Sequence, residues 1–173
     1  MRKPVLSGIE TGIGELFKSA FRRYPTGIAV IAAQGAHGPA GLTASSVASV
    51  SVDPPALSFS VIGSRSARAI LEAPSFTVNL LGPGHAGLAR DFARTGGPRF
   101  TPEQGWSVLP TGEPFLPGAQ ASLRAAPLHL VPVGDSTVVV ATVLEVLLGP
   151  AEGRLVHHDR EFFTHVHGNG NGI

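Results

Sequence analysis

Hydroxyl-bearing residues gather in the segment GLTASSVASVSVDPP, which covers residues 41–55. This segment places Thr43, Ser45 and Ser46 beside small neighbours such as Ala44. Hydroxyls and backbone N–H groups can together hold a phosphate where no cluster of basic residues is present, and small residues let a flat ligand approach the backbone closely. The alternative is an ordinary strand whose hydroxyls face water or bond to neighbouring backbone. Composition alone favours the strand.

A second polar turn, GSRSARAI, covers residues 63–70 and contains Ser64, Arg65 and Ser66. These residues stand at the start of an expected helix, where serine caps belong and where anions also bind. Arg65 adds a fixed cation. Helix capping explains the serines by itself, but two serine-rich turns, one of them beside an arginine, favour a combined phosphate site.

Asn79 interrupts the otherwise apolar stretch FTVNLL. A buried amide needs hydrogen-bond partners. Two interpretations stay open: the Asn79 side chain bonds to backbone at a strand end, or it meets the polar edge of a ligand ring.

The seven histidines raise the question of a metal site. His165 and His167 would share one face of a strand, because side chains alternate along a strand, whereas the adjacent His157 and His158 would point to opposite faces. No carboxylate or third histidine stands at a spacing typical of zinc sites, so we expect no native metal. Neither a Gly-x-Ser-x-Gly elbow nor a Walker loop is present.

Composition limits the function classes further. The 173 residues are enough for one domain with a real core, and 43% hydrophobic with 14% charged residues argues against a disordered chain. So few charges suggest surface hidden in a partner or a second copy. The formal net charge of +1 gives no electrostatic case for binding nucleic acid or an anionic membrane. The absence of cysteine excludes disulfides, thiolate metal sites and cysteine nucleophiles.

The start of the chain, MRKPVLSGIETG, has no apolar run after its basic residues, so it does not read as a signal peptide. No stretch reaches the length of a membrane span without Gly, Pro or charge interrupting it. We therefore expect a cytoplasmic location without membrane contact. We expect residues 1–12 and 168–173 to be tails around a single domain over 13–167.

Periodicity predicts the elements that must position these residues. A helix is expected over 13–24, because six residues recur at helical spacing before Pro25: Ile13, Leu16, Phe17, Ala20, Phe21 and Tyr24. Strands are expected over 26–33, 56–62, 75–82, 121–133, 137–148 and 160–166, and further helices over 65–73 and 85–96. Residues 96–118 are rich in Gly and Pro and read as a long, partly ordered excursion. This pattern favours an antiparallel barrel or sandwich with helices at its ends.

Several stretches, taken in order, resemble the flavin reductase-like family with the FMN-binding split-barrel fold. They are FRRYPTGIAVIAA, GLTASSVASVSVDPPALSFSV, SRSARAI, FTVNLLG, LARDFA, RF, GDSTVVVATV and LVHHDREF. The resemblance spans approximately residues 14–166. It implies a mainly β fold with helices, a split antiparallel β-barrel of about six or seven strands with two or three peripheral helices. It also implies a homodimer with flavin at or near the interface. NADH or NADPH would reduce FMN or FAD, and the reduced flavin would pass to a partner monooxygenase.

The resemblance also implies roles for individual residues. Residues lining the flavin ring and its ribityl phosphate would be Thr43, Ala44, Ser45 and Ser46, with Ser64, Arg65 and Ser66 at the phosphate end. Thr26, in a Pro-Thr-Gly element, and Asn79 would lie near the ring system. His158 would lie on the nicotinamide side. Ser136 would lie there too, because it stands in GDST where family members commonly have Gly-Asp-His-Thr.

The resemblance implies a mechanism that depends on positioning. Hydride passes from the nicotinamide to the flavin when the two rings stack, so no indispensable catalytic side chain is expected. Ser136 and Asp159, which stands where a basic residue or glycine is common, depart from the family pattern on the nicotinamide side. They leave two alternatives: a protein that uses tightly bound flavin on another substrate, and a non-catalytic cofactor-binding module.

Overall fold

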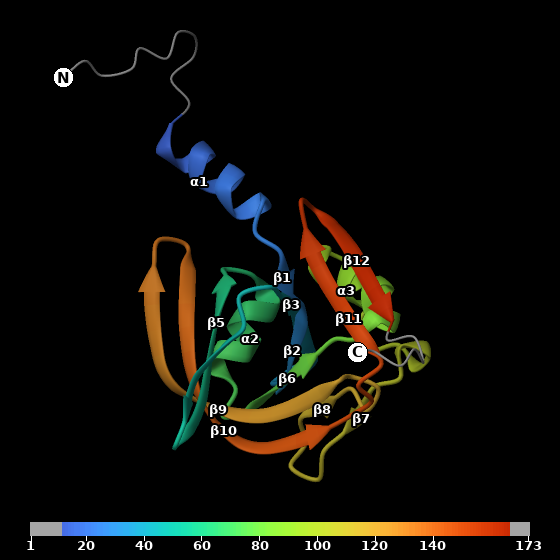
Figure 1. Ribbon diagram of the computed structural model, residues 1–173. Helices are drawn as coiled ribbons and strands as arrows, with labels where there is room; N and C mark the ends of the chain where they lie inside the picture. The colour runs from blue at the N-terminus through green and yellow to red at the C-terminus, as the bar shows by residue number, and fades with distance from the viewer. Residues whose placement is uncertain (1–11, 167–173) are drawn as a thin grey trace, which may run out of the picture.

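The computed structural model describes residues 12–166 and consists mainly of antiparallel strands (Figure 1). Seven strands form one sheet in the order β3-β2-β6-β9-β10-β5-β4. They are β2 (Ala29–Gly35), β3 (Gly38–Ala44), β4 (Ala48–Val52), β5 (Pro55–Ile62), β6 (Phe76–Leu80), β9 (Ala121–Val133) and β10 (Ser136–Leu148). The predicted mainly β, antiparallel fold is confirmed.

Two smaller sheets accompany the main one. One contains β1 (Thr26–Gly27), β11 (Gly153–His158) and β12 (Glu161–Val166), and the other contains β7 (Ser107–Val108) and β8 (Pro114–Phe115). The described residues thus form more strands than the six or seven expected. Five of the expected strands contribute β2, β5, β6, β9 and β10 to the large sheet, and the one expected over 160–166 is β12 of a small sheet. The sequence did not predict β11. Its turn into β12 is made by Asp159 and Arg160, whose φ angles are 47° and 67°; without the glycine or asparagine usual at such positions, the hairpin has no turn signal.

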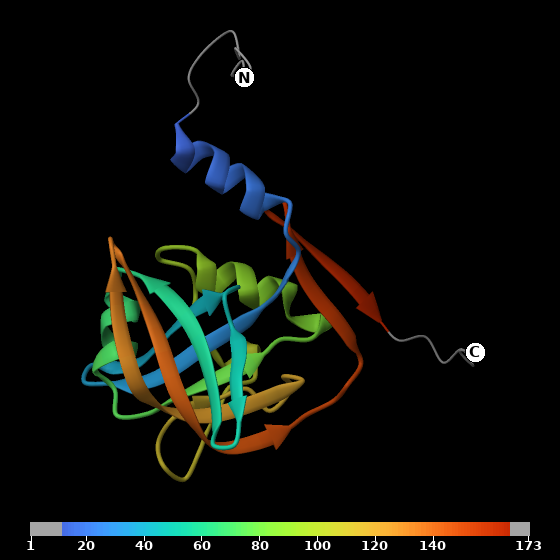
Figure 2. The same ribbon diagram turned by 60° about the vertical axis from the view of Figure 1, so that its left-hand side comes forward.

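The large sheet curls around an apolar core (Figure 2). The helix α2 (Arg65–Glu72) packs Ala67 and Ile70 into that core. Phe59 and Phe76 meet there edge to face, with ring centroids 5.3 Å apart. The edge strands β3 and β4 are not paired with each other in the part of the chain that the structure describes, so hydrogen bonds do not close the sheet into a barrel.

A second core lies under the helix α3 (Ala86–Ala93), which buries Leu88, Ala89 and Phe92 as its spacing predicts. The excursion over residues 96–118 contains only short regular elements, in line with the partly ordered segment expected: the short helix η2 (Pro102–Gln104), β7 and β8. The short helix η1 (Pro83–His85) precedes α3. The Phe100 and Trp106 rings of the excursion lie 4.9 Å apart, and both contact Phe92. This aromatic cluster supplies the packing that a Gly- and Pro-rich composition does not reveal.

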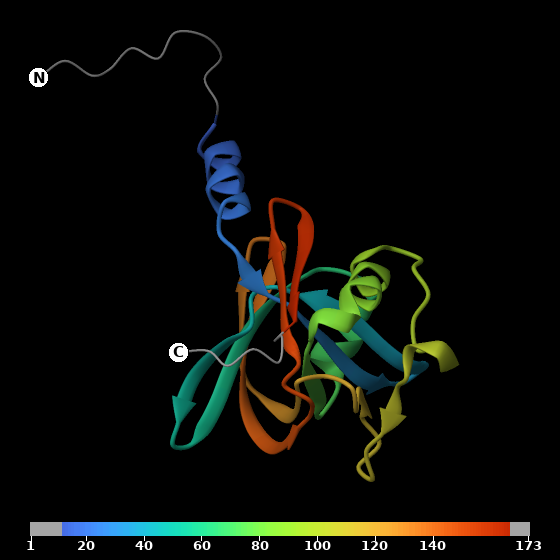
Figure 3. The ribbon, with the colours of Figure 1, turned by 45° about the vertical axis from the view of Figure 1, so that its right-hand side comes forward.

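The helix α1 (Ile13–Arg22) forms as predicted but buries none of its residues. Figures 2 and 3 show it standing away from the sheets. Its last residue meets the β11–β12 turn, where the Asp159 N–H donates to the Arg22 carbonyl at 3.0 Å. Periodicity thus predicted the helix correctly, but none of residues 12–166 buries its apolar face.

Almost all of the predicted tails, 1–12 and 168–173, lies outside the described residues. Within those residues, no helix is long and apolar enough to cross a membrane.

Candidate active site

The serines of the GLTASS segment lie along one end of the large sheet. β3 ends at Ala44, which pairs with Ala29 at the start of β2. Two residues further on, the Ser46 hydroxyl accepts a hydrogen bond from Ser60 N–H at 2.9 Å and contacts the Ser60 carbonyl at 3.3 Å. Ser60 is near the end of β5, four residues before Ser64. The two serine-rich turns are therefore brought to the same end of the sheet. We call this end, which carries Ser45, Ser46 and Ser64, the serine rim.

The phosphate-side residues lie at the start of α2. The Ser64 hydroxyl accepts a hydrogen bond from Ala67 N–H at 3.1 Å, which confirms the predicted cap. A groove of ≈ 540 Å³ opens here and is lined by Ser64, Arg65, Arg68 and Thr137 among others. Neither arginine forms a salt bridge with any residue of 12–166. Glu72 also lines the groove, and the two guanidinium groups beside a helix start suit an anionic ligand.

Three hydroxyl-bearing residues of the predicted set differ in exposure. Ser45 is exposed at the rim, and Ser66 is half-buried on α2. The Thr43 hydroxyl instead donates to the Ala89 carbonyl of α3 at 2.7 Å. Ala44 is buried in the main core. Of the four GLTASS residues assigned to the flavin, Ser45 and Ser46 therefore present their side chains at the surface, whereas Thr43 fastens β3 to α3 and Ala44 packs the core.

Asn79 is fully buried on β6. Its side-chain nitrogen donates to the Val30 carbonyl and to the Thr77 hydroxyl, both at 3.0 Å. Its side-chain oxygen accepts from Leu116 N–H at 2.9 Å and from the Ser122 hydroxyl at 2.8 Å. Of the two interpretations of Asn79, the structure supports bonding within the chain, and the amide has no exposed surface with which to meet a ring.

Thr26 lies on β1 opposite His157 of β11. Its hydroxyl oxygen is buried and has no hydrogen-bond partner among residues 12–166. Because a buried hydroxyl without a partner is unfavourable, this atom is a candidate for a bond from a bound molecule or a second chain. His158 lies next to this pair, at the end of β11.

Ser136 and His158 are not brought together within one chain. Ser136 pairs with Ile62 at the end of β5, and the Gly63 N–H donates to the Asp135 carbonyl at 3.1 Å. Ser136 therefore lies beside the groove at the start of α2. Figure 1 shows the β9–β10 hairpin and the β11–β12 hairpin at opposite sides of the molecule. Within one chain Ser136 and His158 therefore do not share a common side, because pairing with β5 places Ser136 beside the groove at the start of α2.

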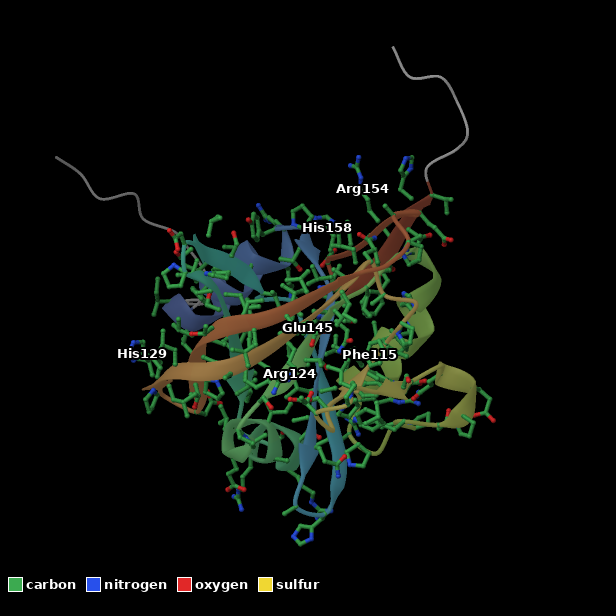
Figure 4. All side chains as sticks on the ribbon, turned by 90° about the horizontal axis from the view of Figure 1, so that it is seen from below. Phe115, Arg124, His129, Glu145, Arg154 and His158 are labelled. Carbon is green, nitrogen blue, oxygen red and sulfur yellow. The ribbon has the colours of Figure 1, made fainter. Side chains whose placement is uncertain are left out.

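The sequence did not single out the buried carboxylate of Glu113, because this residue lies in the Gly- and Pro-rich excursion. Its side chain accepts hydrogen bonds from the Ser75 and Thr111 hydroxyls and from Arg124 Nε, the last at 2.7 Å. Burial raises the pKa of Glu113, but these three donors outweigh it and lower the pKa to about 2. Figure 4 shows Arg124 beside Glu145 of β10, its partner in the sheet register. The cluster fastens the excursion to the large sheet.

The histidines form no metal centre in the described ranges, where no three His, Asp or Glu side chains are grouped to hold an ion. His165 lies on β12, and His167 is outside the described residues.

The family model of the flavin reductase like domain matches residues 21–165. The chain belongs to this family. The match includes the serine rim, the groove at the start of α2 and the β11–β12 hairpin, so the flavin reductase resemblance found in the sequence is confirmed over most of its length.

Proteins named for their activity are also similar to this flavin reductase-like chain. The NADH:FMN oxidoreductase of Rhodococcus qingshengii is 38% identical over 152 residues, which are 85% of this chain and 79% of that protein. The reductase component of 4-hydroxyphenylacetate 3-monooxygenase from Thermus thermophilus is 34% identical over 149 residues, covering 86% of this chain and 94% of that one.

A solved structure of the NADH:FAD oxidoreductase of Streptomyces globisporus C-1027, in complex with NAD and FAD fragments, shares the fold with a TM-score of 0.82. It is 26% identical, and the match covers 93% of this chain and 98% of that one.

Proposed function

We propose that this protein is a flavin reductase that transfers hydride from NADH or NADPH to FMN or FAD. One observation carries the proposal. The exposed serines of the rim and the arginine-lined groove at the start of α2 lie at the same end of the sheet, within a flavin reductase-like domain. The activities for which the Rhodococcus and Streptomyces proteins are named support it.

The described residues fit a flavin at this place. Ser64, Arg65 and the first turn of α2 would hold its phosphate, because hydroxyls, a guanidinium group and helix N–H groups all favour an anion. Ser45 and Ser46 would lie along the flavin, and the buried Thr26 hydroxyl, which has no partner in residues 12–166, would gain one. Asn79 and Thr43 would support this surface from behind, through their bonds to Val30 and Ala89.

The chemistry follows from this arrangement. When bound, the flavin supplies the hydride acceptor, so this chain's residues need no acid or base of their own. They hold the ring and phosphate in place while the nicotinamide approaches, and positioning of two reactants is worth several kcal/mol of the barrier, on the order of 7 or more. Backbone N–H groups at the rim would be suited to meet the negative charge that develops on a reduced flavin.

A matrix of flavin and nucleotide tests the proposal. The purified protein is mixed with FMN or FAD and with NADH or NADPH, and the nicotinamide absorbance band is followed. We expect oxidation above the flavin-only control with at least one pair, and no such oxidation with any pair would refute the activity.

We expect Ser45→Leu to weaken flavin binding about tenfold, because a branched apolar side chain would occupy the rim where the ring or phosphate lies. Ser45 is exposed, so folding should be unaffected. Flavin fluorescence titration measures the dissociation constant. Ser49→Leu, on the neighbouring exposed strand β4, is the matched control and should bind as the parent does. Equal constants for the parent and Ser45→Leu would contradict the proposed pocket.

We propose that the protein is a homodimer in which the apolar face of α1 docks on a second copy. Large apolar side chains on this face are exposed, among them Ile13 at 84%, Phe17 at 62% and Phe21 at 59%. A contiguous apolar face of this kind on a soluble domain marks an interaction site. Burying it in a partner copy would also account for the low share of charged residues, 14%.

Phe17→Glu should shift the dimer toward monomer, because a carboxylate would have to be desolvated in the interface. Light scattering during gel filtration measures the mass across a dilution series. Lys18→Glu changes the charge on the neighbouring position and should leave the mass unchanged. An unaltered dimer in Phe17→Glu, or a monomeric parent, would show that α1 is not the contact.

We further infer that the protein delivers reduced flavin to a partner monooxygenase. The Thermus relative, which is named as the reductase component of a monooxygenase, supports this inference. The curled seven-stranded sheet, enclosing one core with strands β2, β5, β6, β9 and β10, supports the split barrel expected from the resemblance.

One domain over 13–167 and a cytoplasmic location remain predictions.

A further inference from the structure

The strand β3, which carries the first residues of the GLTASS segment, lies against α3 (Figure 3). Alternation along the strand places Gly41 and Thr43 on one face, while Leu42 and Ala44 belong to the other face and pack in the main core. On the first face the Thr43 hydroxyl donates to the Ala89 carbonyl of α3 at 2.7 Å. This face of β3 is therefore fastened to the helix.

Gly41 marks a close approach of β3 to the aromatic cluster under α3. A Cβ atom added at Gly41 would lie 2.6 Å from Cε1 of Phe92 and 3.0 Å from Cζ of Phe100, too close for carbon atoms. Gly41 is not among the glycines with positive φ, so its backbone conformation is open to other residues. The glycine is required by the space between strand and rings and not by the backbone angle.

The Phe92 ring is held on several sides and cannot give way. Its side chain is 1% exposed, and the Phe100 and Trp106 ring centroids lie 5.1 Å and 5.4 Å from its own. Arg99 places its guanidinium carbon 5.7 Å from the ring centroid and donates to the Phe92 carbonyl at 3.2 Å. In a close-packed interior a displaced ring would have to move these neighbours as well. A methyl group at position 41 would therefore move the strand.

The position of β3 determines where part of the serine rim lies. Among the described residues β3 is an edge strand that pairs with β2 alone, so little besides α3 holds its other side. Ser45 follows Thr43 by two residues, which is about 7 Å of extended chain. Ser46 is bonded to Ser60 of β5. A shift of β3 would therefore move Ser45 relative to Ser46 and change the spacing of the two hydroxyls.

We propose that Gly41 and Phe92 are positioning residues for the flavin: the close approach of strand to ring sets the place of Ser45 at the serine rim. Both residues are buried, and they act through β3 without touching the ligand. This inference rests on the proposed reductase function. It gives the aromatic cluster of the 96–118 excursion a part in that function besides its part in the fold.

The experiment measures the dissociation constant of flavin by fluorescence titration, at a temperature where circular dichroism shows each variant folded. Gly41→Ala should raise this constant about tenfold, because a binding site that is displaced by about 1 Å loses its fit. In the double variant Gly41→Ala with Phe92→Leu, the ring edge that the methyl group would meet is gone. Its affinity should return to within about threefold of the parent, since the two changes compensate at one contact.

Two further variants separate position from stability. Phe92→Leu alone should weaken flavin binding by no more than about threefold, because Thr43 still fastens β3 to α3. Val78→Ala is the matched control for lost stability, since Val78 is fully buried in the main core and not in the core under α3. It should lower the melting temperature through the cavity that it creates and leave flavin affinity equal to the parent's.

An unchanged dissociation constant in Gly41→Ala overturns the inference, and so does an equal weakening in Val78→Ala. If Gly41→Ala does not fold, the double variant decides: binding near the parent's supports the inference, and binding about tenfold weaker overturns it. A double variant as weak as a folded Gly41→Ala also overturns it, because the ring would then not be the cause. A parent that neither binds flavin nor oxidises NADH refutes the reductase function and this inference with it. A parent that is active and indifferent to Gly41→Ala refutes the inference alone.

Discussion

Glu113→Gln should destabilise the fold by about 3 kcal/mol, because breaking one partner out of a buried ion pair leaves the other charge uncompensated. The Glu113 side chain is 3% exposed, and Arg124, its partner at 2.7 Å, is 22% exposed. The glutamine amide has the size of the carboxylate, but it lacks the negative charge of the group that accepts hydrogen bonds from Ser75, Thr111 and Arg124. Urea unfolding at pH 7 measures the free energy of unfolding. Glu72→Gln, at an exposed position on α2, should change it by less than about 0.5 kcal/mol.

The same carboxylate should make stability depend on acid. The pKa of Glu113 is lowered from 4.5 to about 2 in the folded protein. A depressed folded-state pKa contributes stability that is fully present above the unfolded value and is lost as pH falls toward the folded value. The parent should therefore lose about 3 kcal/mol from this group between about pH 5 and pH 2. Glu113→Gln should lack that part of the loss, and a parallel decline in both proteins would contradict the assigned role.

Local patterns predicted the elements whose signals are continuous in sequence. β9 occupies residues 121–133 as expected, and α2 starts after the Ser64 cap. β11 was missed because its hairpin turn uses Asp159 and Arg160 at positive φ, where glycine or asparagine would have marked the turn. The packing of the excursion over 96–118 was not predicted, because it comes from aromatic contacts with Phe92, which no local pattern reveals.

In the candidate site, too, the sequence predicted what residue types report but not what depends on contacts between distant segments. The sequence identified the serines and the arginine that meet at the rim, because their residue types report the chemistry directly. It did not determine which hydroxyls face outward, since that depends on pairing: Thr43 lies opposite Val30 and bonds to α3, whereas Ser45 and Ser46 follow the end of the strand. The position of Ser136 beside Ile62, away from His158, is likewise set by a strand pairing between distant segments.

The helix α1 illustrates a further limit. Spacing of Leu16, Phe17 and Phe21 predicts an amphipathic helix, and the helix is present. Periodicity reports that one face is apolar but not what covers it, and in the part of the chain that the structure describes this face stays exposed. The partner therefore has to be sought by measuring mass in solution.

Asn79→Ala should reduce the free energy of unfolding by about 3 kcal/mol, because it removes the partner of several buried polar groups at once. The Val30 carbonyl, the Leu116 N–H and the Ser122 hydroxyl all bond to this one amide, which connects β2, β6, β9 and the segment before β9. Each group left buried without a partner costs about 1 kcal/mol or more. Chemical denaturation measures the loss, and Ser122→Ala, which removes a single bond to the amide, should cost about 1 kcal/mol.

The same variant separates the two interpretations of Asn79. If the amide only supports the rim from behind, the folded fraction of Asn79→Ala should bind flavin within about threefold of the parent, whereas Ser45→Leu should bind about tenfold more weakly at unchanged stability. A sharp fall in the flavin affinity of folded Asn79→Ala would contradict this supporting role. Titration at a temperature where both variants are folded distinguishes these outcomes, because one residue would change stability and the other would change affinity.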